Sequence, residues 1–299
     1  MVRVSALTER RNPSSVDLDL LPTRDMLQVI NEADLGVPLA VRAVLDQVTA
    51  AVEMGVTALR DGKRVHYFGA GTSGRLGALD AAELPPTFNA PHNWFCAHIA
   101  GGREAIWRAV EDAEDDAEAG AAEAASCVRT GDLVVGLAAS GRTPYVLGAL
   151  RAARAAGAGT VLVCADPEAA AAELVDVFIG VETGPEIITG STRMKAATAQ
   201  KLVLNAFSTA VMVRLGRVYS NFMIDVAATN AKLRGRVISI LMEATGSPED
   251  ASLQALNDAE GDLKAALVSL VSGAAVAEAR AALARCGDQV RDALALLAT

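Results

Sequence analysis

Short apolar runs alternate with amphipathic segments over most of this 299-residue chain. Strand-like runs are predicted at residues 65–69, 93–99, 132–138, 160–165 and 175–181, and helices at 38–60, 74–83, 102–119, 144–156 and 191–215. Pro85 and Pro86 should end the helix at 74–83, because proline lacks an amide donor and restricts the preceding residue. A repeated strand–loop–helix order is typical of a parallel sheet with helices on both faces. The sequence therefore predicts a doubly wound α/β fold.

The pattern changes beyond about residue 222, where only helical segments follow. We therefore predict an N-terminal helical segment at residues 1–50, a sheet domain at 51–221 and a helical C-terminal region at 222–299. Hydrophobic residues make up 52% of the chain and aromatic residues only 4%, which suits helices packed on a parallel sheet. No apolar stretch is long enough to span a bilayer, and the N-terminal residues contain no apolar signal region, so we expect a cytoplasmic protein without a membrane partner.

Charge and residue usage exclude several kinds of site. The formal net charge of −9 opposes nucleic-acid binding, so an anionic ligand must be held by local donors. The four cysteines form no CxxC pair and there are only three histidines. We therefore expect reduced thiols, no metal site and no cofactor.

Three segments combine glycine or hydroxyl residues with a cation, and each opens a predicted helix. They cover residues 69–75 (GAGTSGR), 139–144 (ASGRTP) and 189–195 (TGSTRMK). Glycines let the backbone approach an anion, while amides and hydroxyls at a helix start donate to it. Any one loop could be only an N-cap and turn, but three together favour a phosphate site. The candidate phosphate-binding residues are Thr72, Ser73, Arg75, Ser140, Gly141, Thr143, Ser191, Thr192 and Lys195.

The glycines of the first loop also match the dinucleotide-binding pattern GxGxxG, at Gly69, Gly71 and Gly74. That pattern requires an acidic residue near the end of the next strand, to bind the ribose. The next strand-like run, NWFCAHIAGG, ends without one. A phosphosugar is therefore the favoured ligand over a nicotinamide cofactor.

Two glutamates are candidate acid–base groups. Glu83 ends a predicted helix directly before Leu84-Pro85-Pro86, where it could equally be a solvated helix-terminal carboxylate. Glu114 lies in the acidic run EDAEDD, which would normally be a solvated face. On a helix over residues 102–119, Glu114 would flank the apolar stripe, and partial burial there would raise its pKa. Asp116 would flank the other side of the stripe, so geometry leaves both residues open.

Several long segments resemble the N-acetylmuramic acid 6-phosphate etherases, of the sugar-isomerase (SIS) domain superfamily. The matching segments are TERRNPSSVDLD (8–19), FGAGTSGRLGALDAAELPPTF (68–88), HIAGG (98–102), EDAEDD (111–116), VVGLAASGRTPYVLGAL (134–150), GPEIITGSTRMKAATAQKLVLNAFSTA (184–210) and RLGRVYSNFMIDV (214–226). The chain departs from the family at Ala82 and Leu84, where Ser and Cys are common.

The resemblance implies cleavage of the D-lactyl ether of N-acetylmuramic acid 6-phosphate, giving N-acetylglucosamine 6-phosphate and D-lactate in cell-wall amino sugar recycling. It also implies a lyase-then-hydration route, in which Glu83 is the acid that protonates the departing lactate and Glu114 is the base at C2. A homodimer with the active site near the subunit interface is a further expectation. The alternatives are a non-catalytic sugar-phosphate sensor similar to glucokinase regulatory protein, and a phosphosugar isomerase of the same superfamily.

Overall fold

The computed structural model describes residues 7–225 and 231–298, which form two compact units. The first unit contains the chain up to Ala82 together with His92–Ser208, and the second contains Glu83–Pro91 together with the chain from Thr209 onward. The domain boundaries predicted after residues 50 and 221 stay a prediction. Val226, the last residue of one family-like segment, lies outside the described residues.

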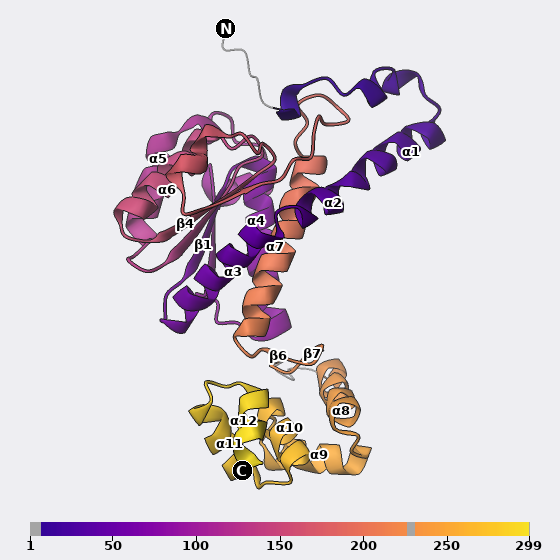
Figure 1. Cartoon of the computed structure of the whole chain (residues 1–299), viewed down its shortest axis with the longest axis vertical. Coiled ribbons are helices and arrows are strands. Elements are labelled where there is room, and N and C mark those ends of the chain that lie inside the picture. The colour runs from indigo at the N-terminus through magenta and orange to yellow at the C-terminus, as the bar shows by residue number, and fades with distance from the viewer. Residues whose placement is uncertain (1–6, 226–230, 299) are drawn as a thin grey trace. The chain divides into compact units, whose positions relative to one another are not determined.

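A five-stranded parallel sheet forms the centre of the first unit (Figure 1). Its strands are β1 (Val65–Gly69), β2 (Phe95–Ile99), β3 (Leu133–Leu137), β4 (Gly159–Cys164) and β5 (Val177–Gly180). They lie in the order β2-β1-β3-β4-β5, so the direction of winding reverses between β1 and β3. This is a doubly wound sheet, as predicted, and in such sheets ligands bind outside the carboxyl ends of the strands at the reversal point.

Helices bury both faces of this sheet. Phe68 and Val134 face α5 (Ala117–Cys127) and α6 (Pro144–Ala155), where they share an apolar cluster with Leu150. Tyr67 points to the opposite face, where its ring contacts Phe207 of α7 (Lys195–Arg214) and its hydroxyl donates to Asp80 of α4 (Gly71–Phe88) at 2.8 Å. Strands covered on both faces read as continuous apolar runs, which is why the sequence located them.

Three predicted helices differ from those observed. The predicted helix at 38–60 is two helices, α2 (Gly36–Arg42) and α3 (Leu45–Arg60), which follow α1 (Thr23–Asp34). Helix α4 runs through Pro85 and Pro86 and does not end before them. Because proline has no amide hydrogen, the carbonyls of residues 81 and 82 lose their helical partners. Both residues are at least partly exposed, so water can take the place of the missing amides.

The predicted helix at 102–119 is wrong. The chain forms two short 3₁₀ turns, Gly102–Ile106 and Ala113–Asp115, before α5 begins at Ala117. Gly101, Gly102 and Asp112 have φ values of 82°, 70° and 58°, which are incompatible with a continuous α-helix. The spacing of apolar residues predicted one helix and could not reveal these turns. Glycines at positions 101 and 102 did not exclude a helix, because glycine also occurs within helices at a cost in stability.

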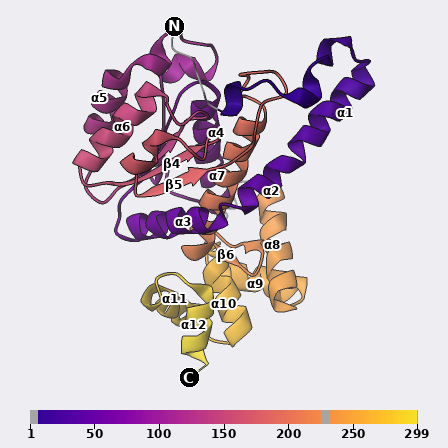
Figure 2. The same cartoon turned by 45° about the horizontal axis from the view of Figure 1, so that its top comes forward.

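The second unit is mainly helical, as predicted for the C-terminal region (Figure 2). A short hairpin of β6 (Val218–Tyr219) and β7 (Phe222–Met223) precedes the helices α8 (Ala231–Thr245), α9 (Glu249–Asp258), α10 (Leu263–Ser272), α11 (Val276–Arg285) and α12 (Val290–Leu297). Buried Lys264 of α10 contacts Asp225 at 2.9 Å and Asp288 at 2.5 Å, and Asp225 also binds Arg217 at 2.6 Å. This ion cluster fixes α10 against the segment that follows the hairpin.

Within the described residues, no individual helix is both long and apolar enough to cross a membrane. Two pairs of consecutive helices reach that length and apolar composition when taken together, but each pair is sharply bent at its junction.

Candidate active site

A cavity of about 450 Å³ lies in the first unit, at the carboxyl ends of the strands. It is lined by Glu9, Ala70, Gly71, Thr72, Ser73, Glu114, Ala139, Ser140, Thr143, Ser191, Thr192 and Arg193. All six hydroxyl residues selected from the three loops are among these lining residues. The loops that follow β1 and β3 both contribute, which places the cavity at the reversal point of the sheet.

The first loop owes its shape to close contact between β1 and the start of α4. A Cβ on Gly69 would lie 2.6 Å from the amide nitrogen of Gly74, and a Cβ on Gly74 would lie 2.7 Å from the carbonyl oxygen of Gly69. Gly71, the first residue of α4, has a φ of 52°. The GxGxxG pattern is therefore explained by strand–helix packing, and it brings Thr72 and Ser73 to the cavity at a helix N-terminus.

The second loop turns sharply between β3 and α6. The Oγ of Ser140 accepts the amide of Arg142 at 3.3 Å, and Gly141 forms the turn with a φ of 70°. Gly141 faces Ala169 and does not line the cavity, whereas Ser140 and Thr143 do. Thr143 directly precedes Pro144, the first residue of α6, so its hydroxyl projects from a helix start.

Glu186 holds the end of the third loop through hydrogen bonds to the backbone at the start of α7. The carboxylate of this fully buried residue accepts the backbone amides of Lys195 and Ala196, each at 2.9 Å, at the start of α7. Burial raises the pKa of Glu186, and it lowers the pKa of Lys195. The Lys195 ammonium donates to the carbonyl of Thr183 at 2.6 Å and does not line the cavity. Exposed Arg193 is the cation that this loop presents to the cavity.

Glu114 reaches the cavity from a turn rather than from a long helix. The chain reverses at Asp112, and Glu114 lies in the following 3₁₀ turn, where its Oε1 accepts the hydroxyl of Thr143 at 2.9 Å. The side chain is exposed, so the partial burial predicted for it on a helix flank is wrong. Asp116 has a different role, because its carboxylate caps α5 by accepting the amide of Ala119 at 2.8 Å. Of the two residues that helical geometry left open, Glu114 lines the cavity and Asp116 does not, and the catalytic role of Glu114 stays a prediction.

Arg75 holds the segment that leads to Glu114. Its guanidinium donates to the carbonyls of Ile106 and Arg108, each at 3.1 Å. Arg75 lines a second cavity of about 230 Å³, which shares Thr72 and Glu114 with the first. Its role as a phosphate ligand stays a prediction.

Glu83 is exposed on α4, twelve residues after Gly71, and does not line the cavity. More than three helical turns of α4 lie between these two residues.

Glu9 lines the cavity and was not selected from the sequence. It ends the 3₁₀ turn Leu7–Glu9, and the neighbouring Thr8 carbonyl accepts the amide of Gly190 at 3.3 Å. The sequence did contain one indication that this region matters, because Glu9 lies in the segment TERRNPSSVDLD, which resembles the etherase family. That resemblance assigned Glu9 no role.

Known structures share the fold of about two thirds of the chain. The chain aligns with a phosphoheptose isomerase from Francisella tularensis with a TM-score of 0.54 and 16% identity, covering 64% of this chain and 100% of that one. A phosphoheptose isomerase from Neisseria gonorrhoeae aligns with a TM-score of 0.51 and 16% identity, covering 64% and 99%. The family model of the glucokinase regulatory protein N-terminal SIS domain matches residues 47–154.

Sequence relatives are much closer. An N-acetylmuramic acid 6-phosphate etherase from Thermobifida fusca is 60% identical over 90% of this chain and 88% of its own length. Relatives of the same name from Cutibacterium acnes and Mycolicibacterium smegmatis are each 50% identical over 97% of this chain, covering 95% and 98% of their own lengths. With the SIS-type sheet and with Glu114 and three hydroxyl-bearing loops at one cavity, this chain belongs to the N-acetylmuramic acid 6-phosphate etherase family.

Proposed function

We propose that this chain cleaves the D-lactyl ether of N-acetylmuramic acid 6-phosphate, giving N-acetylglucosamine 6-phosphate and D-lactate. The observation that carries the proposal is that hydroxyls from three helix-start loops line one cavity together with Glu114. Hydroxyls and helix-start amides suit a sugar phosphate, while a carboxylate supplies the proton transfer that ether cleavage requires.

The phosphate is assigned to the hydroxyl residues of the three loops, with Gly141 shaping the second loop. The lactyl carboxylate of the substrate needs a separate cationic donor. Arg193 is the better candidate for it, because it is exposed at the cavity, whereas the Lys195 ammonium is occupied by the Thr183 carbonyl. A guanidinium can also bind a carboxylate through two parallel hydrogen bonds.

Ring opening makes the ether labile, because C3 then lies β to an aldehyde. Glu114 removes the C2 proton, an acid protonates the lactate oxygen, and the C3–O bond breaks to give an unsaturated aldehyde and lactate. Water then adds at C3, and a proton returns to C2. We assign the acid role to Glu83, as the family resemblance implies. Each proton-transfer group is expected to contribute on the order of 10²–10⁴ in rate.

We also propose that the enzyme is a homodimer with its active site near the subunit interface, as the family resemblance implies. In such a dimer, Glu83 of one copy serves the cavity of the other. The four free thiols suit a reducing compartment, so we also propose a cytoplasmic location.

Lactate release and isotope incorporation test the reaction. Wild-type protein incubated with the substrate in H₂¹⁸O should place the label at C3 of the amino sugar and leave lactate unlabelled. Glu114→Gln should abolish both lactate release and solvent deuterium exchange at C2, whereas Glu83→Gln should lose lactate release and retain exchange. Glu111→Gln is the matched control, because this exposed neighbour does not line the cavity, and it should keep full activity. Label in lactate, or full activity of Glu114→Gln, contradicts the mechanism.

Mixing the two inactive variants tests the shared site. If the two glutamates of one site come from different subunits, a mixed dimer has one site with both glutamates intact, and random mixing restores about a quarter of wild-type activity. If both come from one subunit, every site in a mixed dimer lacks one glutamate and no activity returns. A monomeric active enzyme also contradicts the shared site.

The two alternatives predict different products. A sensor similar to glucokinase regulatory protein would bind the phosphosugar without turnover, and an isomerase would retain the C3 substituent. Neither is favoured, since curated relatives at 46–60% identity over most of the chain carry the etherase name. Lactate detection separates all three.

A further inference from the structure

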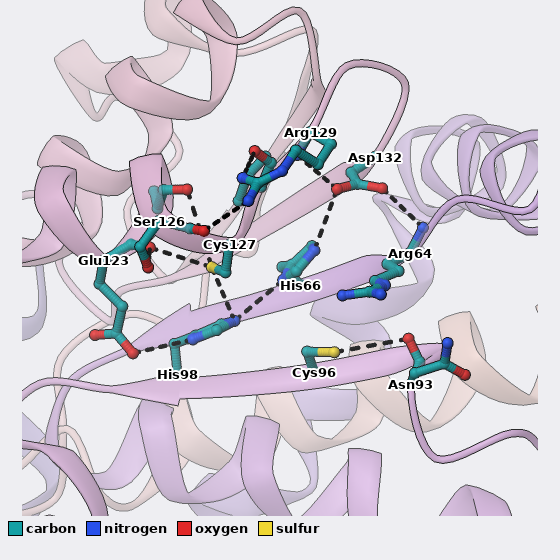
Figure 3. A network of polar contacts seen from close by, with 12 residues as sticks. Arg64, His66, Asn93, Cys96, His98, Glu123, Ser126, Cys127, Arg129 and Asp132 are labelled. Atoms are coloured by element: carbon teal, nitrogen blue, oxygen red, sulfur yellow. Dashed lines mark hydrogen bonds and ion pairs between the residues drawn. The ribbon is translucent and has the colours of Figure 1, made fainter.

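Two histidines and a cysteine converge beneath the sheet edge, outside the cavity described above (Figure 3). His66 lies on β1, His98 on the edge strand β2, and Cys127 at the end of α5. His66 Nδ1 lies 3.1 Å from His98 Nε2, and Cys127 Sγ lies 3.7 Å from the same His98 atom. All three ligand atoms lie within 4.8 Å of one another.

The other nitrogen of each imidazole faces a carboxylate. His98 Nδ1 lies 3.0 Å from Glu123, and His66 Nε2 lies 3.4 Å from Asp132. Both carboxylates are held in place, Asp132 by the amides of Arg64 and Arg129 at 2.9 and 2.7 Å, and Glu123 by the hydroxyl of Tyr145 at 2.6 Å. His66 Nε2 makes no hydrogen bond at its 3.4 Å separation from Asp132. In the tautomers that carry the protons on the nitrogens facing the carboxylates, the lone pairs of both rings are directed at each other.

Two nitrogen lone pairs facing each other at 3.1 Å repel unless a positive species lies between them. A shared proton is one such species, and a metal ion is the other. The Cys127 thiol lies 3.2 Å from the Glu123 carbonyl oxygen, to which it donates when no ion is bound. As a thiolate, the same sulfur would add the third donor of a metal site, which a shared proton does not need. Around a tetrahedral ion with bonds of about 2.0–2.1 Å to nitrogen and 2.3 Å to sulfur, the ligand atoms would be separated by about 3.3 Å and 3.6 Å. The observed separations of 3.1 and 3.7 Å are close to these values, and Cys127 Sγ lies within 4.8 Å of His66 Nδ1.

We propose that His66, His98 and Cys127 form a binding site for a thiophilic divalent ion, Zn²⁺ being the expected one, with water in the fourth position. Imidazole and thiolate are the ligands that Zn²⁺ prefers, whereas Mg²⁺ and Ca²⁺ require oxygen ligands. Glu123 and Asp132 act as outer partners that orient the two rings, an arrangement common to histidine–metal sites.

The site would add a link between α5 and the paired strands β1 and β2, which backbone hydrogen bonds already join. His98 and Cys127 stand at the two ends of the segment that carries Glu114, so a bound ion would tie both ends of this segment to β1. The separations between residues 66, 98 and 127 match no metal-binding motif, and the sequence alone therefore predicted no metal site.

Cobalt substitution tests the site in the full-length protein, purified with a chelator and a reductant that are then removed. Co²⁺ should bind with one equivalent per chain and give both the intense visible bands of tetrahedral cobalt and a sulfur-to-metal charge-transfer band. Zn²⁺ should displace it. In Cys127→Ser the charge-transfer band should disappear, while Cys286→Ser, the matched control at another half-buried cysteine, should leave the titration unchanged.

Glu123→Gln tests the outer partner without touching a ligand atom, and its side chain is 39% exposed, so the fold should tolerate it. It should weaken Co²⁺ affinity by about 10–100-fold. X-ray absorption of the zinc-loaded wild type should show one sulfur at about 2.3 Å and nitrogen at about 2.0–2.1 Å. Absence of stoichiometric Co²⁺ binding, survival of the charge-transfer band in Cys127→Ser, or a sulfur-free zinc shell overturns the proposal, leaving a shared proton between the rings.

Discussion

Helices α5 and α6 pack against each other at Gly120 and Gly148, and we predict that Gly148→Ala disturbs this contact. A Cβ added at Gly148 would lie 2.0 Å from the carbonyl oxygen of Ala117, and one added at Gly120 would lie 2.0 Å from that of Tyr145. Real Cβ atoms essentially never approach within 3.0 Å of another heavy atom, so the helices must separate by about 1 Å. The obstruction is backbone on both sides, and no side-chain rotation can relieve it.

The magnitude follows from two opposing terms. Alanine in place of glycine in a helix interior stabilises by about 0.5–1 kcal/mol. Overpacking a close contact costs about 1–3 kcal/mol, and the backbone nature of this contact places it at the upper end. We therefore expect Gly148→Ala to lower the free energy of unfolding by about 2–2.5 kcal/mol. Each kcal/mol corresponds to about 2–4 °C of melting temperature.

The same displacement should reach the active site. Ala117 begins α5 immediately after Asp116, and Glu114 lies just before it. A shift of about 1 Å in a group that must meet the substrate can cost about 10²-fold in rate. Gly148→Ala should therefore lower kcat for lactate release even at an assay temperature well below its melting temperature, where the variant is still folded.

Urea unfolding and lactate release, measured on the same preparations, check both effects. Gly36→Ala is the control, because nothing lies within 4 Å of its added Cβ, and it should be neutral or slightly stabilising. The double variant Gly120→Ala with Gly148→Ala should cost less than the sum of the single changes, since one separation of the helices accommodates both methyl groups. Wild-type stability and activity of Gly148→Ala, or strict additivity in the double variant, would refute this reasoning.

Three further outcomes are expected. Thr143→Val removes the hydroxyl that binds Glu114, so kcat/KM for lactate release should fall about 10–100-fold with little change in melting temperature, whereas Thr143→Ser should retain most activity. Lys264→Met removes the buried ammonium that contacts Asp225 and Asp288, while Asp225 keeps Arg217, and urea unfolding of the C-terminal helices should show a loss of about 1–3 kcal/mol. Burial raises the pKa of Asp80 above its ordinary value of 3.8, so the folded state binds a proton at this carboxyl more readily than the unfolded state. The free energy of unfolding should therefore fall as pH rises from 3.8 through the pKa of the folded state. Asp80→Asn should flatten that part of a plot of urea midpoint against pH.

Residues near the strand ends were predictable because parallel topology brings them together. Thr72, Ser140 and Ser191 lie far apart in the chain, yet each follows a strand or extended segment and opens a helix. The carboxyl ends of parallel strands share one edge of the sheet, so a sequence that specifies such a sheet also specifies where these loops meet. The shared cavity was in this sense a consequence of the apolar pattern.

Arg75, Lys195 and Glu114 show what this reasoning does not reach. The Lys195 ammonium and two nitrogens of the Arg75 guanidinium donate to backbone carbonyls, and the predicted role of both cations as phosphate ligands stays a prediction. Glu114 was selected on a helix that does not form, and it reaches the cavity through the turn at Asp112. Backbone carbonyls carry no signal in the sequence, since every residue has one.

The sequence by itself determined the parallel sheet, the three hydroxyl-bearing loops and the family, because apolar periodicity, helix-start chemistry and long matching segments are local properties. Only the tertiary structure decided which carboxylates line the cavity, that the Lys195 ammonium binds a backbone carbonyl, and that His66, His98 and Cys127 meet. These outcomes depend on distances of a few ångströms between segments distant in the chain, and such distances are set by packing, which no local pattern encodes.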